Sequence, residues 1–131
     1  MAKLNLVVVA HDRRLLELEC AEVGLPGRLG DLGVLPGHAA LLATLRPGVL
    51  VYRETGGASH EIAVSGGFCE VSDDSVTVLV PNARLPSEVD VAASRSAKEE
   101  AEERLLSAGP DDLLRLQDQL AEAEAHLSIA V

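Results

Sequence analysis

The hydrophobic period of the chain changes once, close to Pro86, and this change restricts the folds that the chain can adopt. Before Pro86, apolar and polar residues alternate in short runs such as Leu16–Cys20 and Val76–Val80. Turn residues separate the runs, among them Gly56, Gly57, Asp73 and Asp74. A period of two with frequent turns is typical of antiparallel strands in a sandwich or barrel. We therefore predict an all-β sandwich of short antiparallel strands over residues 1–86.

Beyond Pro86, apolar residues recur every three or four positions, which indicates helices. The first predicted helix spans about twenty residues and carries a stripe of small side chains: Val89, Ala93, Ala97, Ala101 and Leu105. The second carries a seam of larger ones: Leu113, Leu116, Leu120, Ala123 and Leu127. Ser87 is placed to cap the first helix, and Gly109-Pro110 separates the two. We predict an antiparallel helical hairpin over residues 87–131.

The charge balance narrows the class of partner. Twenty-one acidic residues against eleven basic ones give a net charge of −10, which argues against binding to nucleic acid or to anionic lipid. The aromatic content of 2% excludes base-stacking platforms. A protein partner or a small ligand remains. The acidic run Glu99–Glu103 fits a solvated helix face, and the alternative is a surface that docks on a basic partner.

Cysteine use and the absence of long apolar runs point to a reducing compartment. Cys20 and Cys69 lie in strand-like runs without C-x-x-C spacing, so we expect two buried free thiols. A disulfide or a metal pair is the less favoured alternative. The sequence has no run of eighteen apolar residues and no signal-peptide pattern at its start. We expect the chain to fold in the cytosol.

The inventory of reactive side chains does not favour an enzyme. The four histidines occur singly and without metal-ligand spacing: His11, His38, His60 and His126. His11 and His60 fit exposed positions beside turns, and an imidazolium at His126 would suit the C-terminal end of a helix. Gly66-Gly67 indicates a bulge or a close strand crossing, with Phe68 beside it as the largest core anchor. We predict no catalytic residue and no metal site.

One segment, Gly27–His38, contains four glycines and a proline between strand-like runs, more than an ordinary hairpin turn requires. Gly30–Ala39, then Leu45–Gly48 and Val64–Phe68, resemble in order and spacing the epsilon subunit of bacterial F-type ATP synthases. The resemblance implies a partner-binding surface in this segment. Its residues here are Gly30, Asp31, Leu32, Gly33 and His38.

The resemblance also implies partners and a location. It implies a non-catalytic rotor subunit of a proton-translocating ATP synthase, with His38 facing the gamma subunit and Asp31 facing the polar loops of the c-ring. The hairpin is expected to regulate ATP hydrolysis, and the resemblance implies the catalytic-head subunits as its further partner. The implied location is the cytoplasmic face of a bacterial plasma membrane, reached only by way of the complex.

Some epsilon subunits bind ATP between the two helices through an apolar-Asp-x-x-Arg-Ala motif. Val89-Asp90 matches its start, but Ala93 and Ser94 stand where the motif has arginine and alanine. Arg95 lies two residues further on, about 200° around the helix, so it cannot replace the missing cation. We predict weak ATP binding or none, and no other cofactor.

A different class of function also fits the residues. A free-standing sandwich could bind a small ligand while the hairpin serves as a dimerisation element. A homodimer with a ligand-filled cavity would favour this alternative, and a monomer that binds a gamma subunit would favour the rotor subunit.

Overall fold

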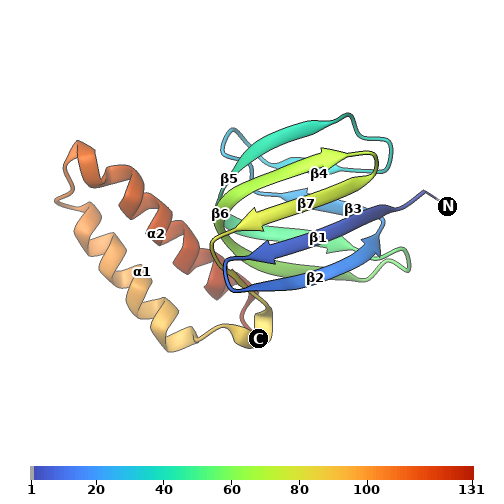
Figure 1. Ribbon diagram of the computed structural model, residues 1–131. Coiled ribbons are helices and arrows are strands. Elements are labelled where there is room, and N and C mark those ends of the chain that lie inside the picture. Colours follow the sequence, from blue (N-terminus) through green and yellow to red (C-terminus); the bar gives the residue numbers. More distant parts are fainter. Residues whose placement is uncertain (1) are drawn as a thin grey trace.

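The computed structural model describes residues 2–131 and places a β-sandwich beside a two-helix hairpin (Figure 1). The eight strands are β1 Leu4–Ala10, β2 Arg13–Cys20, β3 Glu22–Leu25, β4 Leu32–Val34, β5 Leu41–Arg53, β6 Ser59–Ser72, β7 Ser75–Val80 and β8 Ala83–Arg84. The 3-10 helix η1, Pro86–Glu88, leads to α1, Val91–Leu105, and α2, Pro110–Ile129. The predicted class, a strand sandwich followed by a helical hairpin, is confirmed.

The strands form one curved sheet in the order β2-β1-β7-β6-β5-β3-β4, with β8 on β6. All pairs are antiparallel except β1 and β7, which are parallel. Strands β5 and β6 have 13 and 14 residues, so they are longer than the short strands predicted. Because β5 and β6 are this long, each of them runs through both layers of the sandwich. Residues 68–72 of β6 pair with β7, whereas Ala63 and Val64 pair with β8.

The change of partner along β6 occurs at Gly66-Gly67. Both glycines have positive φ, and a Cβ on Gly67 would overlap the carbonyl oxygen of Leu79. The β5–β6 register continues unshifted on either side, from Leu45 opposite Gly67 to Pro47 opposite Ser65. These glycines therefore permit a close approach of strands, as predicted, without inserting a bulge.

The core follows the alternation of the strands, with Leu4, Leu6 and Val8 of β1 wholly buried. Phe68, predicted to be the largest core anchor, is 46% exposed instead. The prediction weighed side-chain size and overlooked the phase of the strand. Cys69 is fully buried, and successive side chains point to opposite faces, so Phe68 must face outward.

Cys20 and Cys69 are buried free thiols, as predicted. Burial raises the pKa of both thiols, which lowers their thiolate fraction and their reactivity.

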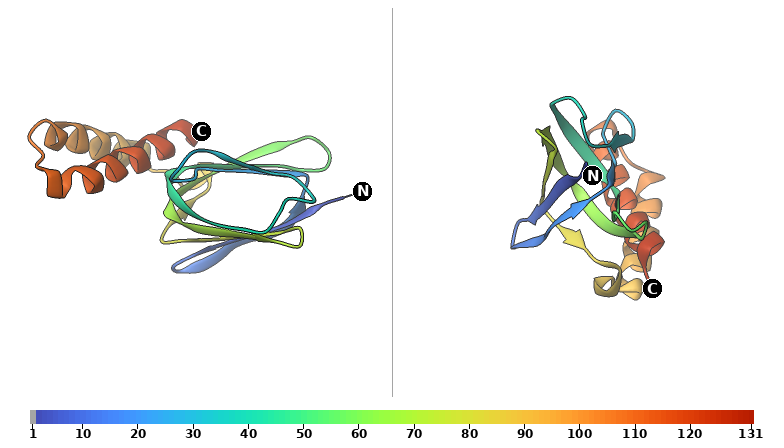
Figure 2. Two further views of the ribbon diagram at one scale, coloured as in Figure 1. Left: turned by 90° about the horizontal axis from the view of Figure 1, so that it is seen from above. Right: turned by 90° about the vertical axis from the view of Figure 1, so that its right-hand side faces the viewer.

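The hairpin touches the sandwich through one helix. Helix α2 packs on β5 and β6 while α1 packs on α2, and the turn between the helices projects away from the sandwich (Figures 1 and 2). Ala125 and Ile129 of α2 are buried against Ala63, with Val49 and Val89 beside them. Sequence analysis did not single out this small apolar cluster. None of the helices within residues 2–131 combines the length and apolarity required to cross a membrane.

The predicted stripe and cap of the first helix differ in detail from the structure. Helix α1 has 15 residues and begins at Val91, because Asp90 is its N-cap and accepts a hydrogen bond from the Ala93 N–H at 3.0 Å. Ser87, the predicted cap, lies inside η1. Ala101 is buried, as the stripe requires, but Ala93 is exposed.

Candidate functional site

The glycine-rich segment is divided by β4 into two separate turns. Asp31 precedes β4 and His38 follows it, with Leu32 and Gly33 in the strand itself. Three residues of extended strand span about 10 Å. The structure therefore does not bring Asp31 and His38 together; it places them at opposite ends of β4, and both are exposed.

Arg46 of β5 holds the first turn, residues 27–31. Its guanidinium donates hydrogen bonds to the Gly27 carbonyl at 2.5 Å and to Asp31 Oδ1 at 2.6 Å. Gly30, with φ of +136°, closes the turn by donating its N–H to the Gly27 carbonyl at 3.2 Å. Asp31 remains 81% exposed, so its carboxylate is paired and still open to a partner. Leu29, at the tip, is fully exposed.

The second turn is held by the β6–β7 hairpin. The Gly37 N–H donates to Asp74 Oδ1 at 2.7 Å, and Gly37 itself has φ of +87°. Asp73 and Asp74 have positive φ, as the predicted tight turn requires. His38 Nδ1 lies 2.7 Å from the carbonyl oxygen of Ala39. This contact orients the ring and leaves it at the surface.

An apolar patch lies on the outer face of β5, β6 and β7. Leu42 is 69% exposed, Phe68 46% and Leu79 38%. Phe68 and Leu79 are direct cross-strand neighbours. Leu42 lies opposite Glu70 and diagonally across from Phe68, so the three apolar side chains share one exposed face of the sheet, which is a candidate surface for a protein partner. Sequence analysis missed this patch because it assigned Phe68 to the core, although the alternation through Cys69 and Val71 carried the signal.

A groove runs between the two helices where the predicted nucleotide motif lies. Val89, Asp90, Ala93 and Ser94 line it, together with Arg84, Arg104 and His126. The Asp90 carboxylate caps α1 and is committed to the Ala93 N–H. Arg95 does not line the groove, in agreement with the helical geometry. The arginines that line the groove, Arg84 and Arg104, thus come from β8 and from the end of α1, and neither stands at the motif position.

His126 is half-buried beside this groove. Burial lowers its pKa, Glu122 opposes this shift and Arg84 adds to it. The predicted imidazolium at the helix end is therefore disfavoured. Within residues 2–131, no group of three or more histidine, cysteine or acidic side chains could hold a metal ion.

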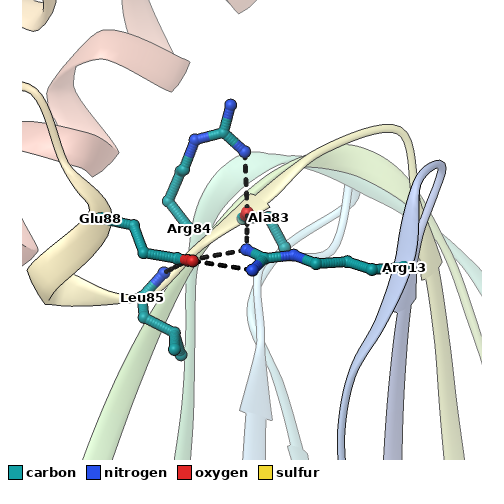
Figure 3. A network of polar contacts seen from close by, with 5 residues as sticks. All are labelled: Arg13, Ala83, Arg84, Leu85 and Glu88. Atoms are coloured by element: carbon teal, nitrogen blue, oxygen red, sulfur yellow. Dashed lines mark hydrogen bonds and ion pairs between the residues drawn. The ribbon is translucent and has the colours of Figure 1, made fainter.

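The connection between sandwich and hairpin is fixed by one carboxylate (Figure 3). Glu88 accepts two hydrogen bonds from the Arg13 guanidinium, both of 2.7 Å, and a third from the Leu85 N–H at 2.8 Å. The Arg13 hydrogen bonds, followed by that of Leu85, lower the pKa of Glu88 to about 2. Sequence analysis did not identify this pair, since its members are 75 residues apart.

Comparison with known proteins identifies the family. Residues 3–86 match the family model described as the beta-sandwich domain of the ATP synthase delta/epsilon chain. The chain is 42% identical to the ATP synthase epsilon chain of Moorella thermoacetica, over 99% of its own length and 98% of that protein. It belongs to the epsilon-chain family of ATP synthases. The epsilon chain of Xanthomonas campestris pv. campestris strain B100 is 39% identical over 97% of this chain and 91% of its own.

Solved structures agree with this assignment. One similar chain belongs to a structure of the OSCP/F1/c-ring part of the Euglena gracilis mitochondrial ATP synthase. It superposes with a TM-score of 0.82 at 27% identity, and the match covers 95% of this chain and 79% of that chain. A chain of the Tetrahymena thermophila mitochondrial ATP synthase central stalk and c-ring has a TM-score of 0.57 at 16% identity, covering 90% and 96%. The second likeness concerns the fold alone. Membership of this family makes the chain a non-catalytic subunit.

Proposed function

We propose that the chain is a central-stalk subunit of a proton-translocating ATP synthase that carries rotation between the c-ring and the gamma subunit. The observation that carries this proposal is the match of the whole chain to an ATP synthase epsilon chain at 42% identity. The superposed Euglena structure contains F1 and the c-ring, which supports these partners. The relatives from Moorella and Xanthomonas are bacterial, which supports a place at the cytoplasmic face of the plasma membrane, held there only by the complex.

The geometry supports a division of the partner surface. Asp31 presents a largely exposed carboxylate at one end of β4, which suits the polar or basic loops of the c-ring. His38 and the apolar patch of Leu42, Phe68 and Leu79 suit the gamma subunit, because exposed apolar side chains of this kind are buried in the core of a protein interface. In this proposal the two turns bind two different partners.

We further propose that residues 87–131 form a regulatory unit that can leave the sandwich. Of its two helices, α2 supplies the main contact with β5 and β6, and the apolar cluster at this contact is small. The hairpin carries eleven acidic residues and four basic ones, counting Glu88 onward. A brake that binds acidic segments of the catalytic head needs cations, so its contacts there rest on Arg95, Lys98, Arg104 and Arg115.

For the groove between the helices we propose weak ATP binding or none. Val89 and Asp90 alone lack a cation for the phosphates, and the Asp90 carboxylate is engaged as the cap of α1. A charge-assisted hydrogen bond to phosphate is the contact that the motif arginine would supply.

Reversing the charge of Asp31 tests the proposed docking on the ring. Asp31→Arg should weaken co-purification with the c-ring at low salt about fivefold or more, and the loss should shrink as salt rises. Glu54→Arg, an equal charge change at an exposed position of the β5–β6 turn, is the matched control. Asp31→Asn separates loss of the negative charge from repulsion of Arg46. Equal co-purification of all three variants with the wild type would exclude an Asp31 contact with the ring.

A further inference from the structure

One ion pair joins the 27–31 turn directly to the hairpin. Arg28 Nη1 donates to Asp118 Oδ1 at 2.9 Å, and Nη2 donates to Oδ2 of the same carboxylate at 2.6 Å. Asp118 lies in the middle of α2. The side chains are only 36% and 31% exposed, which is less than for the ion pairs that lie within α1 or α2. A two-point contact of this kind fixes both distance and orientation.

The apolar contact that holds the hairpin on the sandwich is small. It consists of Ala125 and Ile129 against Ala63, with Val49 and Val89 beside them. Two of these five side chains are alanine, and free energy from apolar burial scales with the area removed from water. The Arg28–Asp118 pair therefore adds a directional polar contact to a small apolar one.

The position of Arg28 depends on the residue expected to meet the ring. Arg28 donates its N–H to the Thr44 carbonyl at 2.9 Å, which ties its backbone to β5. Arg46 bonds the Gly27 carbonyl immediately before Arg28 and the Asp31 carboxylate at the other end of the turn. A cation that binds Asp31 competes with Arg46 for this carboxylate. It thereby loosens the turn that presents Arg28.

We propose that the 27–31 turn is a latch: Arg28 holds the hairpin through Asp118, and occupation of Asp31 by a basic group of a docking partner weakens that hold. The latch itself is a property of the free chain. Only the identity of the group that reaches Asp31 rests on the proposed function. The same turn thus carries the docking residue and the residue that retains the hairpin.

The latch is tested by measuring the distance between spin labels at Thr55, on the β5–β6 turn, and Ser107, on the turn between the helices. Both positions are exposed, whereas the native Cys20 and Cys69 are buried. In the full-length chain we expect Arg28→Gln and Asp118→Asn each to raise the released fraction about threefold to fivefold. The charge-swapped double variant, Arg28→Asp with Asp118→Arg, should restore the docked distance.

Asp112→Asn is the matched control, because Asp112 pairs with Arg115 inside α2 and not with the sandwich. It should leave the distance distribution unchanged. If Arg28→Gln and Asp118→Asn also leave it unchanged while both chains remain folded by circular dichroism, the latch does not exist. The same conclusion follows if Asp112→Asn releases the hairpin as much as Asp118→Asn does.

The coupling to Asp31 is tested in the same free chain. Asp31→Asn should release the hairpin in the wild-type background, by less than Arg28→Gln, and should add nothing in the Arg28→Gln background. Equal effects of Asp31→Asn in both backgrounds would overturn the coupling. Because these distances are measured without partners, they separate failure of the latch from failure of ring docking, which the co-purification of Asp31→Arg reports.

Discussion

The sandwich and the hairpin are built from side chains of different size, and this difference separates a rigid part from a releasable one. The sandwich core consists largely of leucine, isoleucine and valine, with Leu6, Leu50 and Ile62 wholly buried. Of the six buried residues of the hairpin, four are small, namely Ser94, Ala101, Ala123 and Ala125, and the other two are Leu116 and Ile129. Burial free energy follows apolar area. The sandwich can therefore be stable by itself, whereas the hairpin depends on its contact with the sandwich.

A core substitution in each region should show the largest difference. Ile62→Ala should lower the free energy of unfolding of the sandwich by about 2–5 kcal/mol, because it leaves a cavity in a closely packed site. Leu116→Ala removes a similar volume from α2 and should reduce helical content while leaving the sandwich transition nearly unchanged. Urea unfolding followed by circular dichroism, with two-dimensional NMR for the sandwich signals, measures both. An equal loss of sandwich stability in both variants would show that the two regions unfold as one.

Removal of the hairpin should have the next largest effect. A chain that ends after Val89 keeps Glu88 and its contact with Arg13, and we expect it to melt cooperatively, since the main core cluster lies wholly between Leu4 and Leu85. In the complex it should retain ATP-driven proton pumping, with hydrolysis equal to or faster than that of the intact enzyme. Failure of the shortened chain to assemble would make the hairpin structural and end its regulatory interpretation.

Acid should remove the stability that the connection between the two regions contributes. The pKa of Glu88 falls from its ordinary value of 4.5 to about 2 in the folded chain. Above about pH 4.5 Glu88 is charged in both the folded and unfolded states, so its pairing with Arg13 stabilises the fold fully. Between about pH 4.5 and 2 only the unfolded state binds the proton, and this stabilisation declines. Thermal midpoints of the wild type and Glu88→Gln should therefore differ at neutral pH and converge towards pH 2.

Glu70→Gln on β6 is the control for this measurement, because Glu70 is an exposed carboxylate that lies opposite Leu42 of β5 and Thr77 of β7, at the far end of β6 from the connection. Its thermal midpoint should keep a constant offset from the wild type across the same range. A Glu88→Gln curve that runs parallel to the wild type down to pH 2 would contradict the lowered pKa.

A cation added to the groove should have the smallest effect on stability. Ala93 is exposed and lines the groove, so Ala93→Arg meets no packed neighbour and should change stability by no more than about 0.5 kcal/mol. It restores the missing motif cation and should strengthen ATP binding by about 1.5–3 kcal/mol, as measured by calorimetry. Ala92→Arg places the same charge about 100° around the helix and should leave ATP binding unchanged. Tight ATP binding by the wild type would refute the argument from the missing arginine.

Local patterns in the sequence predicted local structure. The Asp73-Asp74 turn, the buried cysteines and the start of α2 at Pro110 all follow from residues close together in the chain. The glycine-rich segment was predicted as a single unit, and its role in binding a partner stays a prediction. Its division by β4 was missed because a three-residue strand is too short to show a period.

Contacts between distant residues could not be predicted in this way. The sequence contains many acidic residues that one fold or another could bring to Arg28. The packing of α2 on β5 determines that Asp118 is its partner. The N-cap shows the same limit at short range. Ser87 and Asp90 are both good capping residues, and the choice between them depends on η1, which the pairing of Glu88 with Arg13 holds in place.

The parallel pairing of β1 with β7 sets an order for folding. Asn5 lies opposite Ser75, so the first strand of the chain meets this neighbour only after seventy further residues have been synthesised. Its other neighbour, β2, follows at once, which leaves a two-stranded ribbon in which the second edge of β1 is unpaired during translation. Long-range pairing of this kind slows folding. A ribosome-bound chain therefore has to keep the free edge of β1 from pairing with other chains until β7 emerges, and the hairpin is made only after β7.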